Sequence, residues 1–470
     1  MNECRLEHDC IGEREVPDVH YYGVQTLRAV ENYPISRISI SHYPRLIDSL
    51  AYIKMAAAYA NNKLGLLDDN KARHISLACE DILEGKLYDQ FVVDVIQGGA
   101  GTSTNMNANE VIANRGLEIM GHKRGQYEFL HPNSDVNMSQ STNDVYPTAV
   151  RITLITKIRL LIEAMGTLKA SFERKAEEFA PIIKMGRTQL QDAVPMSLGQ
   201  EFAAYAVMIG EDMQRLDEAK DLVREINMGA TAIGTGLNAH PDYADVVTKK
   251  LSDLIGIELI KAHDLVEATQ DTGAYVQLSG VLKRVAVKAS KICNDLRLMS
   301  SGPRCGLNEI NLPPRAPGSS IMPGKVNPVI PEVVNQTCFY VVGADMTVTM
   351  ACEAGQLELN VMEPVIAHSL FSSLMYLHNA FLTLAHSCVD GITANEEVCR
   401  GYVRNSIGLV TALNPYIGYE KSTEVAHEAM RTNASVYDIV LEKGYLTKDD
   451  LDDILSPENM LRPRYFHEKK

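Results

Sequence analysis

The sequence lacks the features that mark membrane proteins and secreted, disulfide-linked proteins. No apolar run approaches the roughly 20 residues that a helix needs to cross a bilayer. The first residues are too polar for a secretory signal peptide. The nine cysteines are odd in number, are scattered along the chain and form no Cys-x-x-Cys pair. We therefore expect free thiols and a cytoplasmic protein.

Basic residues are also in deficit. The 45 Lys and Arg residues stand against 60 Asp and Glu residues, so the formal net charge is −15. This balance argues against nucleic acids and anionic membranes as partners. Because the overall field repels anions, an anionic substrate would have to be held by local hydrogen-bond donors and local positive charge.

Nucleotide and metal motifs are missing as well. A phosphate-binding loop requires Gly-Lys-Ser/Thr after four spacer residues, and nothing of this kind follows Gly98. Gly324 and Lys325 fail the same test because Val326 comes next. No spacing typical of zinc, haem or flavin ligands occurs. We therefore expect no required cofactor and no metal ligand set.

Several segments repeat apolar residues at alternating steps of three and four. Steps averaging 3.5 residues predict long helices that pack nearly parallel to their neighbours, although shorter helices in an ordinary globular core fit the same periodicity. Strand signals are sparse, with one short candidate at 20–24. The three clearest stripes are Leu154, Ile158, Leu161, Met165, Leu168 and Phe172; Leu278, Val281, Val285, Ala289, Ile292, Leu296 and Met299; and Leu370, Leu374, Leu377, Phe381 and Leu384.

The 470 residues exceed one ordinary core, so we expect more than one domain. Breaks are predicted where loop-rich sequence meets helical pattern. This gives an N-terminal mainly helical domain at 1–143, a central long-helix bundle at 144–395 and a small C-terminal helical domain at 396–470. The polar tail at 462–470 is expected to fray.

Four segments are rich in glycine, hydroxyl and amide residues, namely 98–110, 139–144, 186–193 and 318–328. In the first, glycines precede Thr102, where a helix would begin and offer N–H groups to an anion. In the last, Lys325 supplies a point charge suited to a carboxylate. Each segment also has a plain structural interpretation. The second would cap a helix, the third would be a polar turn before a helix starting near Pro195, and the last would be a flexible loop.

The string Gly318-Ser-Ser-Ile-Met-Pro-Gly-Lys-Val-Asn-Pro328 is more specific than its parts. Together with Tyr21-Tyr-Gly-Val-Gln-Thr26 and Gly418-Tyr-Glu420, it resembles the aspartase/fumarase superfamily over nearly the whole chain. The resemblance implies a mainly α, three-domain fold with a long central helical bundle. It also implies a homotetramer whose active sites draw segments from three subunits.

The resemblance implies roles for residues of all four segments. Ser319 matches the catalytic base. The positions that match substrate-binding residues are Thr102, Ser141, Thr142, Asn143, Thr188, Gln189, Ser320, Lys325 and Asn327. Divalent-cation activation is a trait of this family on which the residues carry no information.

The implied reaction is the reversible conversion of L-aspartate to fumarate and ammonia through an aci-carboxylate intermediate. Fumarate hydratase is the main alternative. Fumarases place a histidine at the position of Gln189, paired with a glutamate that matches Glu332. A glutamine amide does not exchange a proton at neutral pH, whereas ammonium leaves without a general acid. A third hypothesis, a structural relative without catalysis, is disfavoured because Ser319 and Lys325 are present.

Overall fold

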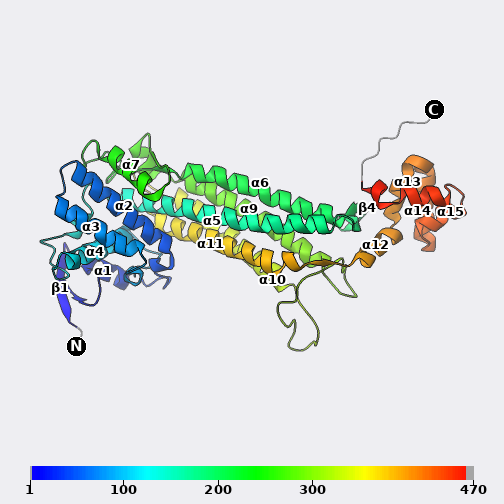
Figure 1. The fold of residues 1–470 in the computed structure, drawn as a ribbon, viewed down its shortest axis with the longest axis horizontal. Helices are drawn as coiled ribbons and strands as arrows, with labels where there is room; N and C mark the ends of the chain where they lie inside the picture. The colour runs from blue at the N-terminus through cyan, green and yellow to red at the C-terminus, as the bar shows by residue number, and fades with distance from the viewer. Residues whose placement is uncertain (1–2, 462–470) are drawn as a thin grey trace. The chain divides into compact units, whose positions relative to one another are not determined.

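Helices dominate the chain, as the sequence predicts. The computed structural model describes residues 3–461, shown in Figure 1. The tail at 462–470, which we expected to fray, lies outside the described residues. The five longest helices are α5 (Thr142–Glu178), α6 (Leu198–Leu222), α9 (Gly273–Met299), α10 (Val329–Glu353) and α11 (Glu363–Ser387). The shorter ones are α1 (Val24–Asn32), α2 (Pro44–Lys63), α3 (Asp69–Leu83), α4 (Thr102–Ile119), α7 (Tyr243–Ile255), α8 (Leu265–Gln270), α12 (Glu396–Asn405), α13 (Val410–Ile417), α14 (Tyr419–Thr432), α15 (Val436–Glu442), α16 (Lys448–Ile454) and α17 (Pro457–Met460).

The strands are short and occur only as pairs within the described range. β1 (Cys4–Asp9) and β2 (Gly12–Pro17) form an antiparallel hairpin, as do β3 (Ile183–Thr188) and β4 (Gln191–Ser197). β5 (Glu225–Ile226) pairs in parallel with β6 (Ile260–Lys261), and β7 (Ile310–Asn311) is antiparallel to β8 (Thr393–Ala394). The strand predicted at 20–24 is wrong, because this segment instead leads into α1, and the N–H groups of Gly23 and Val24 bind side-chain carboxylates.

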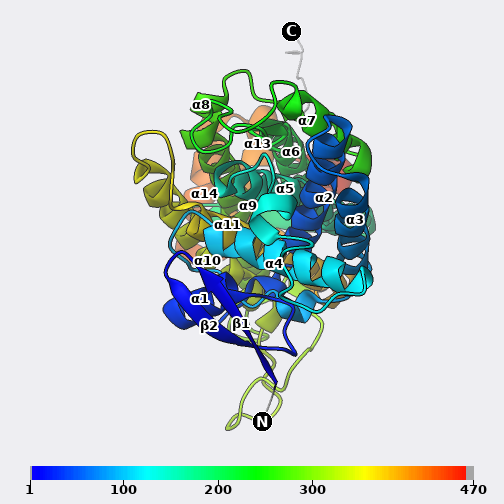
Figure 2. The same cartoon turned by 90° about the vertical axis from the view of Figure 1, so that its left-hand side faces the viewer.

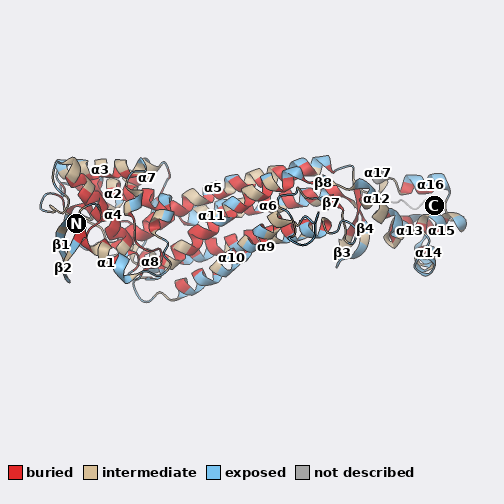
Figure 3. Ribbon diagram, turned by 90° about the horizontal axis from the view of Figure 1, so that it is seen from below, coloured by how far each residue is buried: buried red, intermediate tan, exposed pale blue. Residues whose placement is uncertain are grey.

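The three apolar stripes lie on α5, α9 and α11, and their residues form the core (Figure 3). Every stripe residue of α5 is 0% exposed, and those of α11 are at most 1% exposed. Among the stripe residues of α9, Val281 is partly exposed and the others are buried. The 3.5-residue spacing therefore marks faces that this chain buries by itself. No helix in the range 3–461 combines the length and apolarity needed to cross a membrane.

The chain divides into two units. Unit 1 comprises Met1–Ile162, Gln214–Ala286 and Phe339–Leu377, and unit 2 comprises Glu163–Met213, Val287–Cys338 and His378–Lys470. The division into three domains at 143 and 395 stays a prediction, although α5 and α12 begin next to those positions.

Polar and aromatic contacts join the long helices within each unit. In unit 1, Ser279 and Lys283 of α9 donate hydrogen bonds to Asp345 of α10, at 2.8 and 2.6 Å. In unit 2, the ring of Phe172 of α5 lies edge-on to that of Tyr205 of α6. These contacts accompany the burial of the apolar stripes and fix which helix faces meet.

The N-terminal part of unit 1 is a layer of shorter helices. α2 packs against α3 and α7, and α3 packs against α4. Figure 2 shows the β1–β2 hairpin lying beside α1. This layer carries the loops that precede α1 and α4, so its packing determines where those loops stand.

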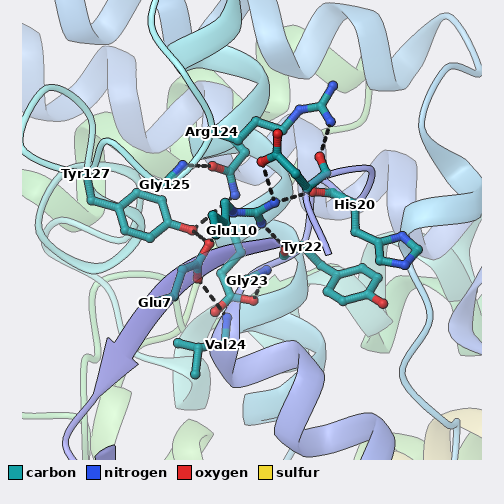
Figure 4. A network of polar contacts seen from close by, with 12 residues as sticks. Glu7, His20, Tyr22, Gly23, Val24, Glu110, Arg124, Gly125 and Tyr127 are labelled. Atoms are coloured by element: carbon teal, nitrogen blue, oxygen red, sulfur yellow. Dashed lines mark hydrogen bonds and ion pairs between the residues drawn. The ribbon is translucent and has the colours of Figure 1, made fainter. Parts of the chain in front are cut away.

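Two buried carboxylates hold the segment that leads into α1 (Figure 4). Glu110 of α4 accepts hydrogen bonds from the backbone N–H groups of Gly23 (2.8 Å), Gln25 (2.9 Å) and Thr26 (3.1 Å). Glu7 of β1 accepts one from Val24 at 2.8 Å. The N-terminus of α1 has no cap from its own N-cap residue, Gly23, and these carboxylates take that role.

Gly23 is required by this arrangement. A Cβ atom there would lie 2.5 Å from Glu7 Oε2, 2.8 Å from the Tyr127 hydroxyl and 2.9 Å from Glu110 Cδ. Burial raises the pKa of Glu110 to about 7. The segment at 21–26, which carries part of the family resemblance, is therefore held by its backbone against α4.

We predict that Glu110 makes stability depend on pH near neutrality. Its pKa in the folded chain lies above its ordinary value of 4.5, so the stabilisation from its proton is full in acid and is lost as pH rises through about 7. The loss is of the order of 3 kcal/mol. In Glu110→Gln this titration is absent, so the difference in unfolding midpoint between parent and variant should shift in favour of the variant from pH 5 to 8.

The control is Glu118→Gln in the same helix. The pKa of Glu118 is lowered by its hydrogen-bond and ion-pair partners, although burial opposes them. The difference in unfolding midpoint between the parent and Glu118→Gln should therefore stay constant over the same pH range. A constant difference for Glu110→Gln as well would contradict the prediction.

Candidate active site

The predicted site residues fall into two groups, one in each unit. Three of the unit 1 residues, Thr102, Ser141 and Thr142, line one cavity of ≈ 410 Å³. α4 begins at Thr102 and α5 begins at Thr142, so the N-termini of two helices meet at this cavity. The positive dipole ends at such positions favour an anion, although the N–H groups of Thr102, Thr104 and Asn143 already have partners within the chain.

The loop before α4 has a backbone that few residues tolerate. Gly99, Ala100 and Gly101 all have positive φ, at 87°, 56° and 89°. A Cβ atom at Gly101 would lie 2.4 Å from the ring of Tyr146, so only glycine fits. The hydroxyl of Thr102 donates a hydrogen bond to the Gly99 carbonyl at 2.7 Å. The turn thus presents the exposed Thr102 side chain at the cavity edge.

Asn143 has a different position from its neighbours. Its side chain donates a hydrogen bond to the Ala232 carbonyl at 2.7 Å, and its own carbonyl accepts one from Asn227 at 2.9 Å. It is not among the residues that line the cavity. A substrate-binding role for Asn143 stays a prediction, and in this structure its amide joins the start of α5 to the loop after β5.

A buried cation lies beneath the same cavity. Lys54 of α2 is 0% exposed, and its ammonium donates hydrogen bonds to Asn105 (2.8 Å), Asn137 (3.0 Å) and Gln140 (2.9 Å). All three amide residues line the cavity. Burial lowers the pKa of Lys54 to about 7, against the opposing effect of Asp144. Sequence reasoning missed Lys54 because it sits in the middle of an unremarkable helical segment.

The unit 2 group centres on the loop before α10. The Ser319 Oγ accepts hydrogen bonds from the backbone N–H groups of Ile321 and Met322, at 3.1 and 3.0 Å. The Asn327 side chain donates a hydrogen bond to the Gly318 carbonyl at 2.6 Å. A Cβ atom at Gly318 would lie 2.0 Å from the Lys325 carbonyl, so the loop closes tightly at its base.

Lys325 and Asn327 line a second cavity, of ≈ 750 Å³, together with Arg297 and Glu332. The Lys325 side chain is exposed. Ser319 and Ser320 belong to the same loop but are not among the residues that line this cavity. Two cations and a neutral amide on one cavity make a suitable surface for a carboxylate.

Thr188 and Gln189 stand at the tip of the β3–β4 hairpin, where both are exposed. Gln189 and Leu190 form a two-residue turn with positive φ at both positions, at 54° and 64°. The helix predicted to start near Pro195 is present as α6 but begins at Leu198, because Pro195 itself lies in β4. Pro195 pairs with Met185 beside a register shift, a place where a sheet tolerates proline.

The chain matches the lyase family model over residues 12–343 and the model of the fumarase C C-terminus over residues 409–462. It is 59% identical over 466 residues to the aspartate ammonia-lyase of Helicobacter pylori strain ATCC 700392 / 26695, covering 99% of this chain and 100% of that protein. It is 56% identical over 465 residues to the aspartate ammonia-lyase of Escherichia coli K12, covering 99% and 97%.

Two solved structures are similar over nearly the full length. A fumarate lyase:delta crystallin from Brucella melitensis, bound to cobalt, has a TM-score of 0.96 and 55% identity, covering 98% of this chain and 100% of that one. A class II fumarase from Schistosoma mansoni has a TM-score of 0.92 and 33% identity, covering 97% and 99%. The fumarase/aspartase-like helical fold is thereby confirmed, and the chain belongs to the fumarase/aspartase superfamily of lyases.

Proposed function

We propose that this lyase has aspartate ammonia-lyase activity and converts L-aspartate reversibly to fumarate and ammonia. The observation that carries the proposal is the near-complete alignment, at 56–59% identity, with proteins of that name. The reaction removes a weakly acidic proton from C3 and lets the charge flow into the neighbouring carboxylate. Hydrogen-bond donors that converge on this carboxylate stabilise the transition state more than the ground state.

The unit 1 cavity supports the binding of that carboxylate. Thr102, Ser141 and Thr142 supply hydroxyl groups, and two helix N-termini supply positive dipole ends. In its protonated form, Lys54 adds positive charge beside the neutral amides that line the cavity, and its pKa of about 7 makes this charge depend on pH near neutrality. This local field offsets the net charge of −15, which otherwise repels a dicarboxylate.

Ser319 is proposed as the base that takes the C3 proton. A serine hydroxyl is a very weak acid, so the reaction requires the alkoxide to be stabilised. The two backbone N–H groups that donate to its Oγ support this role, because they would favour the charged form. Exclusion of water by a closing loop would strengthen both interactions.

The other unit 2 residues are proposed to hold the substrate. Lys325 and Asn327 bind the α-carboxylate with Thr188, and Ser320 contacts the second carboxylate. The Asn327 amide has a further N–H beyond the one directed at Gly318, so it can serve both the loop and the substrate.

The proposed chemistry requires no cofactor, since the carboxylate itself accepts the developing charge. Ammonium leaves as neutral ammonia, so no general acid is needed and Gln189 is compatible with the reaction. Among the residues that the structure describes, no three His, Cys, Asp or Glu side chains are grouped to hold a metal ion. No step of the proposed mechanism depends on one.

We further propose a homotetramer in which different copies complete each site. The apolar stripes of α5, α9 and α11 are buried within the chain, so the support for assembly comes from another face. Phe339, Val342, Met346 and Met350 lie along one face of α10 and are 38–66% exposed. A contiguous apolar face of this kind on a long helix fits a second copy of the same chain.

A cytoplasmic location is proposed as well. The nine cysteines all lie in the described range and none forms a disulfide there. Free thiols persist in a reducing compartment. Small-molecule dicarboxylates are the expected substrates, and the acidic charge balance argues against nucleic acid as a partner.

The substrate prediction is tested by absorbance assays for fumarate, run separately with L-aspartate and with L-malate. We expect rapid fumarate release from L-aspartate and little or none from L-malate, because Gln189 provides no proton for a departing hydroxide. Rapid release from L-malate with none from L-aspartate would establish a hydratase. Release from neither substrate would favour a structural relative without catalysis.

The role of Ser319 is tested by Ser319→Ala. Loss of a proton-transfer group should lower kcat by about 10²–10⁴ while the binding of succinate, a dicarboxylate inhibitor, survives. Lys325→Ala is the contrasting variant, since loss of its charge should weaken succinate binding as well as turnover. A Ser319→Ala enzyme that turns over within a fewfold of the parent would show that the hydroxyl only stabilises the loop.

A further inference from the structure

Asp144 lies in the first turn of α5, next to the unit 1 cavity, and is 0% exposed. Its two carboxylate oxygens accept hydrogen bonds from different segments of the chain. Oδ1 accepts one from the Ser141 backbone N–H at 2.9 Å. Oδ2 accepts two, from the N–H groups of Gly229 at 3.2 Å and Thr231 at 3.0 Å. The carboxylate therefore joins the start of α5 to the loop between β5 and α7.

Helix capping explains only one of these contacts. Ser141 Oγ accepts a hydrogen bond from the Asn143 N–H at 3.2 Å, and Asp144 reaches back to the Ser141 N–H. Ser141 thus caps the helix through its Oγ, and the bond from its N–H to Asp144 is the second half of a capping box, which uses only Oδ1. The bonds to Oδ2 add nothing to the cap. They hold Thr231, which lines the same cavity as Ser141 and Thr142.

The loop at 227–238 holds one residue, Thr231, in a backbone conformation that this residue type does not favour. Thr231 is β-branched and has a φ of 55°, a left-handed conformation that such residues rarely adopt. Its hydroxyl oxygen is shielded from solvent and has no hydrogen-bond partner within the described chain. Strain of this kind persists only where the surroundings impose it, and it gathers at functional sites.

Close packing prevents the loop from relaxing. A Cβ atom at Gly229 would lie 2.6 Å from the Ala244 Cβ, and one at Gly234 would lie 2.3 Å from the Val266 Cα. The Asn143 side chain adds a hydrogen bond to the Ala232 carbonyl. The cavity thus has one wall from residues 141–142 and another from Thr231, with Asp144 bonded to both.

We infer that Asp144 is a positioning residue, which sets the separation of the Ser141–Thr142 wall from the Thr231 wall around a bound dicarboxylate. This inference rests on the proposed function for the identity of the ligand. Asp144 is buried, so it acts through the groups that it holds. A displacement of about 1 Å in such groups lowers the rate by around 100-fold.

Asp144→Asn tests the inference. The amide can keep its oxygen on the Ser141 N–H, but its NH₂ group then faces the N–H groups of Gly229 and Thr231, and donors repel donors. We expect kcat/KM for L-aspartate to fall about 10- to 100-fold at a temperature where the variant is fully folded. Amide hydrogen exchange at 227–231 should become faster.

Asp94→Asn is the matched control. Asp94 is also buried, and it accepts hydrogen bonds from three backbone N–H groups, those of Ser36, Arg37 and Ile96, each at 2.8 Å. It does not line the cavity. Asp94→Asn should lower the unfolding midpoint of the protein but leave kcat/KM within about threefold of the parent. The groups that donate hydrogen bonds to the substrate are not displaced by this change.

Asp144→Glu serves as a second variant that keeps a carboxylate for the Ser141 N–H, since Glu commonly accepts from the N-cap N–H at this helix position. Its longer side chain shifts the contact with Thr231, so it should fold well and still lose activity. Parent-like kcat/KM in the folded Asp144 variants, or equal losses in Asp144→Asn and Asp94→Asn, would overturn the inference.

Failure of the proposed function would be recognised separately. A parent enzyme that releases no fumarate from L-aspartate refutes the activity but not the link between the two walls. Hydrogen exchange then decides the matter. Faster exchange at 227–231 in Asp144→Asn, but not in Asp94→Asn, supports the link. Unchanged exchange in Asp144→Asn overturns it.

Discussion

Buried carboxylates that accept backbone N–H groups are the interactions on which the unit 1 cavity depends. Glu110 holds the segment before α1, and Asp144 joins the start of α5 to the loop after β5. Every residue except proline carries a backbone N–H group, so a change of side chain does not remove these donors. Each carboxylate therefore fixes the course of the backbone segment whose N–H groups it accepts. Burial raises the pKa of Glu110 and that of Asp144 to about 7. The geometry of the cavity therefore depends on carboxylates whose pKa lies near neutral pH.

The positive charge near the unit 1 cavity opposes the negative field of the protein as a whole. The chain carries a net charge of −15, yet the cavity joins two helix N-termini with the Lys54 ammonium beneath it. Lys54 donates to neutral amide oxygens of three residues that line the cavity, so its charge is not cancelled by an adjacent carboxylate in those bonds. Local donors in a shielded site act more strongly than distant surface charge, which water and salt screen.

Periodicity in the sequence located the helical stripes, such as Leu154 to Phe172, and the family resemblance was needed to predict that they belong to long helices. Periodicity could not show that this chain buries the stripe itself, nor that α10 would leave Phe339 exposed, since both depend on tertiary packing. The family resemblance, and not the hydroxyl content of the segments alone, implied that Thr102 and Ser141 bind the substrate, and both residues line one cavity. Lys54 was missed because its three partners come from residues 51 to 86 positions away in the sequence.

The central claim is that the two groups of site residues act together across copies of the chain. It is tested most directly by mixing Ser319→Ala with a Ser141→Ala/Thr142→Val double variant, each inactive alone, after dissociation and reassembly. If different copies supply the two groups, random mixing in equal amounts should restore about one quarter of the parental sites. The absence of any fumarate release from L-aspartate by the mixed enzyme, with tetramers reformed, would contradict the account.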